Sequence, residues 1–232
     1  MIIQLLHTGK KLLLLLSIMV MMEASAEESK AKPQPFIKDL GNNQYQVGQI
    51  VIDKSKGQFR VPGKVIRTEP PLEFLAVTKG GFKAYESMLE LEVNAFEFNL
   101  ACILIGLDNE NVKPAKFHFD AKPVEGDRVE LQIEWRQKGA TVFVSAAELL
   151  VEGEKDPKHP QSDWIYLGST FYPDGKYMAE VDGVLVGFVH SPASVIEHRT
   201  GVGLGNYGAV GVSKKVPPLD TPVVLIVKKS RK

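Results

Sequence analysis

The sequence predicts an α+β protein that is predominantly β, with an antiparallel or mixed sheet packed on one buried helix. Three observations carry this prediction. Many short segments are rich in Val and Ile and are bordered by Gly, Pro, Asp or Ser, which is typical of strands. Residues 129–136 alternate apolar and polar side chains with a period of two. A single apolar segment, residues 95–105, carries the end signals of a helix.

The amino-terminal residues have the organisation of a secretory signal peptide, which we assign to residues 1–26. Lys10 and Lys11 precede an apolar run, and Ala24-Ser25-Ala26 supplies the small residues expected before a cleavage site. The apolar run is shorter than the roughly 20 residues of a spanning helix, so a retained membrane anchor is the less favoured alternative. We therefore expect a periplasmic or secreted protein with no integral membrane segment after cleavage.

After the signal peptide, the sequence predicts a short tether followed by one folded unit. Residues 27–43 are charged, contain Pro33 and Pro35, and have little apolar content, so we expect a flexible tether. Residues 44–228 are then a single domain. With 28 basic and 28 acidic residues the formal net charge is zero, which argues against nucleic acid as a partner.

The strands are expected at eight places. Gly48 interrupts the alternation of the first segment and is interpreted as a bulge, whereas Lys138-Gly139 is expected to turn the chain in a hairpin. Residues 72–77 have the length of a buried strand. In chain order the predicted strands are 45–52, 58–61, 72–77, 129–136, 141–144, 164–167, 184–189 and 223–227.

The helix at residues 95–105 is predicted from both of its ends. Asn94 can cap it, Glu97 stands at the third helical position as in a capping box, and Gly106 can end it in a left-handed conformation. Apolar residues go nearly all the way round, so we expect this helix to be buried against the sheet. Cys102, the only cysteine, lies within it, which excludes an internal disulfide and favours a buried, unreactive thiol over a redox role.

Tyr85-Glu86-Ser87 invites a catalytic interpretation in which the serine is a nucleophile. In a strand, however, Glu86 and Ser87 point to opposite faces, and in a helix the serine lacks a base. No Gly-x-Ser-x-Gly elbow surrounds Ser87, so hydrogen bonds to nearby backbone are the favoured role. An enzyme would need Glu86, Ser87 and Asp163 to be brought together by folding, and these three are the candidate catalytic residues.

Two other patterns suggest cofactors, but neither leads us to assign one. Gly203-Leu-Gly205-Asn-Tyr-Gly208 has the letters of a dinucleotide fingerprint, yet no helix is expected after it, so a glycine loop is favoured. The histidines of the mature chain lack metal-ligand spacing, and a metal site would have to be assembled in space. The residues that could contribute are His118, His159, His190 and His198 with Asp156, Asp163 and Asp174. We therefore assign no metal and no cofactor.

Two further side chains have alternative placements. His118 lies between Phe117 and Phe119 in an alternating run, so it is expected on the outer face together with Lys116 and Asp120. Trp164 comes after a loop rich in Pro and charge, and it either lines a ligand cleft or, as we favour, belongs to the core.

Five segments resemble, in order, the YdjY-domain family of exported bacterial proteins. They are residues 47–53, 85–89, 100–106, 163–169 and 217–223, within a similarity that runs from about 44 to 227. Family members usually have His-Glu-Ser where this chain has Tyr85-Glu86-Ser87, and Tyr titrates far from neutrality, so a proton-carrying role at this position is not transferred. A ferredoxin-like label used for some members is not transferred either, because such a cluster needs about four cysteines.

The resemblance implies a fold and a compartment, and it brings no established activity. Together with the missing catalytic sets it favours a non-enzymatic binding or interaction module of the bacterial cell envelope, whose partner is an envelope protein or a small ligand. The alternative is an envelope enzyme with a polar site around Glu86, Ser87 and Asp163. The two hypotheses differ in what they expect at the surface: a concave polar pocket for the enzyme, and a flat apolar patch for the interaction module.

Overall fold

The computed structural model describes residues 37–152, 158–203 and 210–230, and the predicted signal peptide lies outside these ranges. The described residues all belong to one compact unit. Its elements, in chain order, are β1 (Ile37–Gly41), β2 (Gln44–Val47), β3 (Ile50–Asp53), β4 (Gln58–Val65), β5 (Phe74–Thr78), the 3-10 turn η1 (Phe82–Glu86), β6 (Ser87–Leu91), α2 (Ala95–Leu104), β7 (Asp127–Gln137), β8 (Ala140–Ser145), η2 (Ala146–Leu149), β9 (Leu150–Glu152), β10 (Trp164–Tyr166), α3 (Met178–Asp182), β11 (Val184–Gly187), β12 (Ile196–His198), β13 (Val210–Val212) and β14 (Pro222–Lys229).

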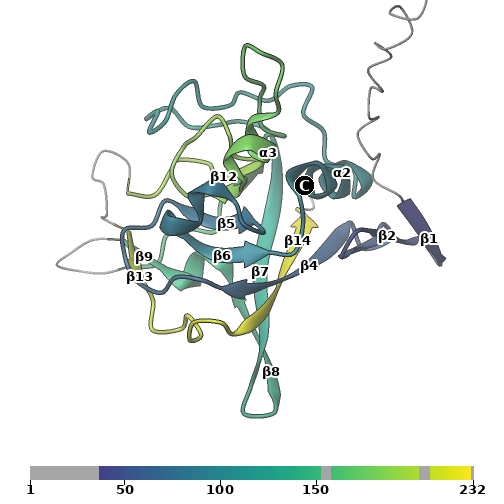
Figure 1. The fold of residues 1–232 in the computed structure, drawn as a ribbon, viewed down its shortest axis with the longest axis vertical. Coiled ribbons are helices and arrows are strands. Elements are labelled where there is room, and N and C mark those ends of the chain that lie inside the picture. Colours follow the sequence, from purple (N-terminus) through teal and green to yellow (C-terminus); the bar gives the residue numbers. More distant parts are fainter. Residues whose placement is uncertain (1–36, 153–157, 204–209, 231–232) are drawn as a thin grey trace, which may run out of the picture. The chain divides into compact units, whose positions relative to one another are not determined.

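The main sheet closes on itself, because β6 pairs with β4 as well as with β5. The closed, barrel-like ring therefore runs β4-β14-β7-β10-β12-β11-β5-β6 and back to β4 (Figure 1). Its neighbours are antiparallel except for β5 with β6 and β11 with β12, which are parallel. The predicted predominantly β fold is thus confirmed, and the sheet is mixed.

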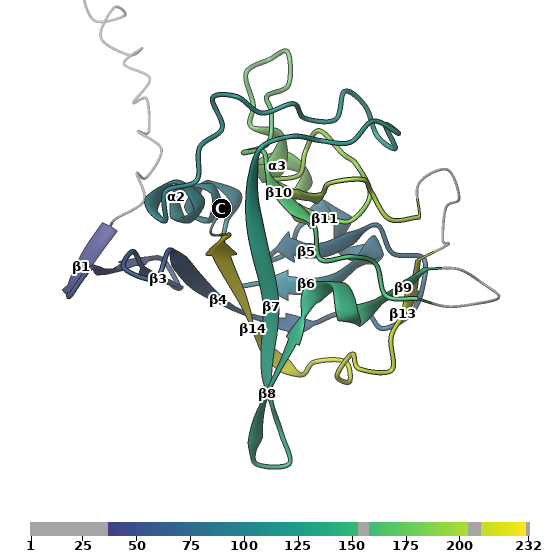
Figure 2. The ribbon, with the colours of Figure 1, turned by 180° about the vertical axis from the view of Figure 1, so that it is seen from behind.

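The long strands β7 and β14 pair with each other over residues 129–135 and 223–229. β7 has the predicted alternation, with Val129, Leu131 and Ile133 buried and the residues between them more exposed. β8 folds back on β7 through Lys138 and Gly139, both of which have positive φ, so the predicted hairpin is confirmed. This hairpin extends away from the ring in both views (Figures 1 and 2).

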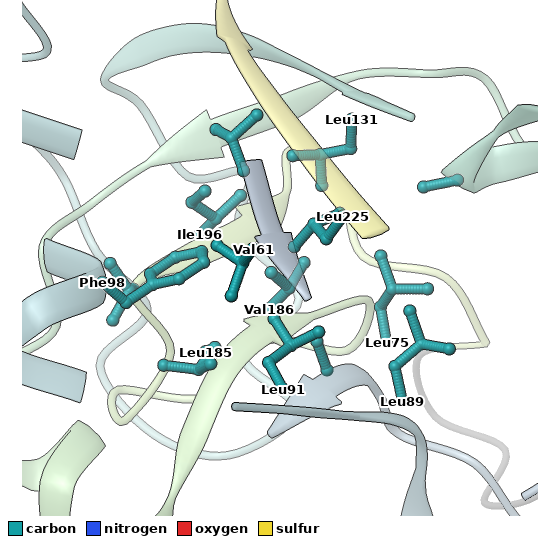
Figure 3. Close-up of a cluster of buried hydrophobic side chains, with 14 of the residues drawn as sticks. Val61, Leu75, Leu89, Leu91, Phe98, Leu131, Leu185, Val186, Ile196 and Leu225 are labelled. Carbon is teal, nitrogen blue, oxygen red and sulfur yellow. The ribbon is translucent and has the colours of Figure 1, made fainter. Parts of the chain in front are cut away.

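The core fills the space between the strands and α2. Figure 3 shows Val61, Leu131 and Leu225 from three neighbouring strands meeting Ile196 and Phe98 from β12 and the helix. Phe98 packs edge-to-face on Phe59, with 5.3 Å between ring centroids. These contacts join α2 to the ring at a point where both side chains are fully buried.

The helix has the predicted ends but only part of the predicted burial. Asn94 Oδ1 accepts a hydrogen bond from the Glu97 amide at 2.9 Å, and Gly106 has a φ of 89°. On the outward face, however, Phe96 is 43% and Ile103 49% exposed, so α2 packs on the sheet as expected but also forms part of the surface, which was not expected. The reason is geometric: α2 packs on the core along one face, and no described segment covers the other.

Two expectations near the start of the domain also change. The predicted strand 45–52 is two strands, β2 and β3, joined by a turn in which Gly48 has a φ of 54°, so Gly48 is not a bulge. The carboxylate of Glu97 lies over this turn, 2.6 Å from the position that a Cβ on Gly48 would take. In addition, residues 37–41, which we expected in the tether, form β1 and pair with β2.

No helix in the described ranges is both long enough and apolar enough to cross a membrane.

Candidate functional site

The Tyr85-Glu86-Ser87 motif lies where η1 leads into β6, and its polar groups are held by their own neighbours. The buried Glu86 carboxylate is 2.7 Å from Lys83 Nζ, and Ser87 Oγ donates to the Lys83 carbonyl at 2.7 Å. Burial opposes the charge on Lys83, but the hydrogen bonds to Glu86 and Tyr85 outweigh it and raise the pKa of this lysine. The motif is therefore an ordered junction, with Ser87 bonded to backbone as the sequence indicated.

Asp163 lies far from this junction. It precedes β10, which is four strands away from β6 in either direction round the ring. Its two carboxylate oxygens are bound by Arg128 and by Arg199, the latter Nε at 2.6 Å. With about 4.8 Å between neighbouring strands, the ring separates Asp163 from Glu86 and Ser87, and the fold does not bring the three together.

A buried polar cluster covers the outer side of β12, and sequence reasoning missed it. Ile196 faces the core, so the adjacent Glu197 faces outward, yet Glu197 has no exposed surface. One of its oxygens accepts a hydrogen bond from the Ser191 amide. In the described part of the chain, its other oxygen, Oε2, has no hydrogen-bond partner, and the same is true of the Ser194 hydroxyl.

Glu197 is consequently an unusual acid. Burial raises its pKa to about 8, and the negative charge of Asp120 acts in the same direction, whereas the hydrogen bond from the Ser191 amide opposes the shift. At neutral pH the folded protein therefore keeps this carboxyl largely protonated. The sequence gives no signal for it, because Glu197 only follows the apolar pair Val195-Ile196 and is itself followed by His198 and Arg199.

His190 joins the two segments that cover Glu197. Its ring is fully buried, with Nδ1 2.5 Å from the Asp120 carbonyl oxygen and Nε2 3.1 Å from that of His198. Both ring nitrogens thus face backbone carbonyl oxygens of segments that are remote in sequence from each other. The Asp120 carboxylate, whose pKa is lowered first by the Lys122 and Lys116 amides and also by His190, supplies the neighbouring negative charge.

The remaining histidines bond to protein groups. His118 Nε2 is 3.0 Å from the buried Glu73 carboxylate, and His159 Nδ1 is 2.8 Å from the Leu150 carbonyl oxygen. His118 and Asp120 do not share an exposed face as expected, because residues 115–120 form a loop in which Asp120 is buried. The burial of His198 lowers its pKa, and its Nε2 lies 2.8 Å from the Gln161 carbonyl oxygen.

The possible metal partners are not gathered in one place. Asp174 pairs with Lys176 at 2.7 Å, Asp163 pairs with arginines, and Asp156 lies outside the described residues. Within the described ranges, no group of three or more His, Cys, Asp or Glu side chains has the arrangement of a metal site.

Three other features that the sequence singled out are Trp164, Cys102 and the glycine-rich loop. Trp164 is fully buried in the core, as we favoured, and does not line a cleft. Cys102 is buried as well, and burial raises the pKa of its thiol. Of the glycine-rich loop only Gly203 is described, and residues 204–209 are not; the next described segment of the chain begins with strand β13.

The most distinctive surface lies beside the family motif and is apolar. Phe82 is 71% and Phe171 64% exposed, and Tyr85, Phe96 and Val181 are also exposed. We call these five residues the aromatic surface. Phe82 and Val181 line one shallow hollow of about 360 Å³. The buried Tyr177 ring lies against two other members, with its centroid 5.0 Å from Phe96 and 5.4 Å from Phe171.

The polar groups around the aromatic surface already have partners within the chain. Lys79 Nζ is 2.8 Å from Glu92, and the Glu180 carboxylate accepts a hydrogen bond from the Ala95 amide at 2.9 Å. Lys83 is paired with Glu86. Among the described residues of this region, the exposed groups without a partner are therefore aromatic and aliphatic side chains. Sequence alone does not reveal it, because exposed and buried phenylalanines look alike in a sequence.

Comparison with known proteins gives one result that covers most of the chain. The family model described as the YdjY domain matches residues 50–228, which includes every element from β3 to β14. No curated protein and no solved structure matches the chain. Because this match covers most of the chain, the chain belongs to the YdjY domain family.

Proposed function

We propose that this protein is an exported, non-enzymatic binding module of the bacterial cell envelope, and that it binds a partner protein through the aromatic surface. The single observation that carries the proposal is the cluster of exposed rings on η1, on α2 and in the loop before α3, next to Glu86 and Ser87. The signal-like amino terminus supports export.

The chemistry of the aromatic surface indicates what kind of partner to expect. Protein interfaces are enriched in aromatic residues at their centre and carry a polar rim. Here Phe82, Phe96 and Phe171 form the apolar part. The neighbouring Lys79 is paired with Glu92, and the Glu180 carboxylate accepts a hydrogen bond from the Ala95 amide. Because little unbalanced charge is left, the partner is expected to contribute an apolar patch, and the association should depend only weakly on salt.

Site-specific crosslinking tests the proposal. A photo-reactive amino acid is placed at Val181, within the aromatic surface, and in a second strain at Phe143, which is 55% exposed on the distant β7–β8 hairpin. In intact cells we expect one defined protein adduct from position 181 and none from position 143. Equal labelling from both positions, or none from either, would overturn the proposal.

A second variant tests the same surface by binding strength. Phe82→Ser with Phe171→Ser removes two exposed rings and should weaken capture of that partner by about tenfold or more, because such rings act as binding hot spots. The matched control is Phe143→Ser, which removes an exposed ring elsewhere. If the control weakens capture equally, the effect is not specific to the aromatic surface.

Glu86→Gln separates this proposal from an envelope enzyme. Since Glu86 is buried and bound to Lys83, we expect the substitution to lower the free energy of unfolding by about 1–3 kcal/mol. The free energy is measured by urea denaturation. A variant of unchanged stability that abolishes a cellular phenotype would instead favour a chemical role for Glu86.

A further inference from the structure

A second surface, separate from the aromatic one, is a groove lined by basic side chains. It encloses about 870 Å³ and is formed by the turn between β3 and β4, the start of β7 and the end of β14. Its lining residues are Lys54, Ser55, Lys56, Gly57, Gly126, Asp127, Arg128, Lys229 and Ser230. Four of them are cationic and one is anionic.

The groove has a fixed frame. The Lys229 amide donates to the Gly57 carbonyl at 2.9 Å, and the Ser230 amide donates to the Arg128 carbonyl at 3.0 Å. Gly57 has a φ of 60°, a conformation that favours glycine, and the position of a Cβ there lies 3.8 Å from Lys229 Cβ. Backbone hydrogen bonds thus hold three segments, remote in sequence, at set positions, and the cations project from this frame.

Three of the four cations of the groove are paired with a carboxylate. Lys56 lies 3.1 Å from Asp53, Lys229 lies 3.2 Å from Asp127, and Arg128 is paired with Asp163. Lys54 Nζ lies over the Tyr45 ring, 5.7 Å from its centroid, and has no carboxylate partner in the described part of the chain. The side chains of Lys56 and Arg128 are 66% and 59% exposed, so each can contact an anion in the groove while it stays near its carboxylate.

An acidic hollow borders the groove on one side. It is lined by Asp108, Asn111 and Glu125 and shares Gly126 and Asp127 with the groove. An anion is repelled from this hollow, so it is confined to the basic side, next to the turn at Lys54 and Lys56.

We propose that the basic groove binds a multivalent anion that carries phosphate groups. Lysine ammonium groups bind phosphate as point charges, and an arginine guanidinium binds it through paired N–H donors. Ser55 and Ser230 add hydroxyl groups, and the volume lies within the range of small-molecule sites. The phosphate is either that of a soluble polyphosphate or that of a lipid headgroup at the membrane surface.

Titration calorimetry with sodium tripolyphosphate tests the soluble source. At about 0.02 M salt we expect saturable binding that weakens strongly at about 0.2 M salt, because screening shortens the reach of the charges. Lys54→Gln with Lys56→Gln should weaken binding about tenfold. The matched control is Lys79→Gln with Lys176→Gln, which removes two exposed lysines elsewhere.

Sedimentation with vesicles tests the lipid source. Phosphatidylglycerol vesicles should retain the unmodified chain, and neutral phosphatidylcholine vesicles should not. Retention that is lost in the Lys54/Lys56 variant supports the groove with a headgroup as ligand, even if tripolyphosphate fails to bind. Absence of binding in both assays, or equal losses in the two lysine variants, overturns the proposal.

The two proposals fail independently. Phe82→Ser with Phe171→Ser removes no lining residue of the groove and should leave phosphate binding unchanged. If the unmodified protein captures no partner at position 181 but binds phosphate, only the aromatic-surface proposal is refuted; if it captures a partner but binds no phosphate, only the groove proposal is refuted.

Discussion

The ring of strands is covered in two different ways. Helix α2 is one continuous apolar segment, and it buries Phe98, Ala101 and Cys102 against the core. The outer face of β10 and β12 is instead covered by residues 112–124 and 188–195, which meet through His190 and enclose Glu197. The first cover is stabilised by packing of apolar groups, whereas the second depends on polar groups that are remote in sequence.

These two covers show that burial of apolar and of polar groups has different consequences. The apolar cover can leave rings such as Phe96 exposed on its outward side, because a hydrocarbon ring has no polar group that needs a hydrogen-bond partner. In the polar cover, each enclosed polar group needs a hydrogen-bond partner. Among the described residues, Glu197 Oε2 and Ser194 Oγ have none. The polar cover should therefore respond to pH, and the helical cover should not.

The largest expected effect lies in the helical cover. Phe98→Ala removes a fully buried ring that packs on Phe59, so the free energy of unfolding should fall by about 3–5 kcal/mol. Phe96→Ala, on the exposed face of the same helix, should cost less than about 1 kcal/mol. Urea denaturation measures both, and equal losses would show that the helix does not pack along one face.

The polar cover should make stability fall as pH rises. The pKa of Glu197 is raised from 4.5 to about 8, so the native state holds a proton that the unfolded chain releases. The stabilisation is complete below pH 4.5 and is lost as pH rises through 8, by roughly 3 kcal/mol between pH 4.5 and 7.

Glu197→Gln is the matching variant, because it keeps the shape of the side chain and cannot ionise. It should flatten this part of the pH profile of the unfolding free energy, with the Asp120 carboxylate and the His190 imidazole as the neighbouring groups that remain. Thermal melts between pH 4.5 and 8 measure the difference. An unchanged slope in the variant would assign the pH dependence to other groups.

Gly187→Ala tests how closely the polar cover lies on β11. A Cβ at this position would come within 2.6 Å of Ser194 Oγ and 2.9 Å of the Val189 carbonyl oxygen. We expect a loss of about 1–3 kcal/mol from overpacking. Adding Ser194→Ala should recover part of it, since one of the two close contacts disappears; a double variant no more stable than the single one would place the strain at Val189.

The smallest expected effect concerns the start of α2. Asn94→Ala removes the acceptor for the Glu97 amide and should cost about 1 kcal/mol, whereas Asn94→Asp keeps an acceptor and should cost less. Both values come from denaturation curves. Equal losses would mean that the hydrogen bond to Glu97 is not what stabilises this end of the helix.

Much of the fold could be predicted because its signals are local. The alternation along β7, the turn at Lys138 and Gly139 and the ends of α2 at Asn94 and Gly106 each depend on a few neighbouring residues. The division of 45–52 into two strands was missed, because a glycine with positive φ serves a bulge as well as a tight turn. Short elements such as α3 and β12 were missed because their windows are too small to show a period.

The candidate site was predicted less well, because it depends on which segments meet. Ser87 bonded to backbone as expected, but whether Asp163 lies near Glu86 depends on the position of β10 in the ring. The exposure of Phe82 and Phe171 depends on the absence of a covering segment in the described chain, which no local pattern encodes.

The sequence by itself determined that this protein is mostly β, where its helix begins and ends, and to which family its segments are similar. The tertiary structure decided that the sheet closes on itself, that Glu197 is buried, that Glu86 and Asp163 lie apart, and that one side of α2 is left open. The physical reason is that hydrogen bonding and periodicity act between near neighbours, whereas burial is set by whichever remote segment packs on top.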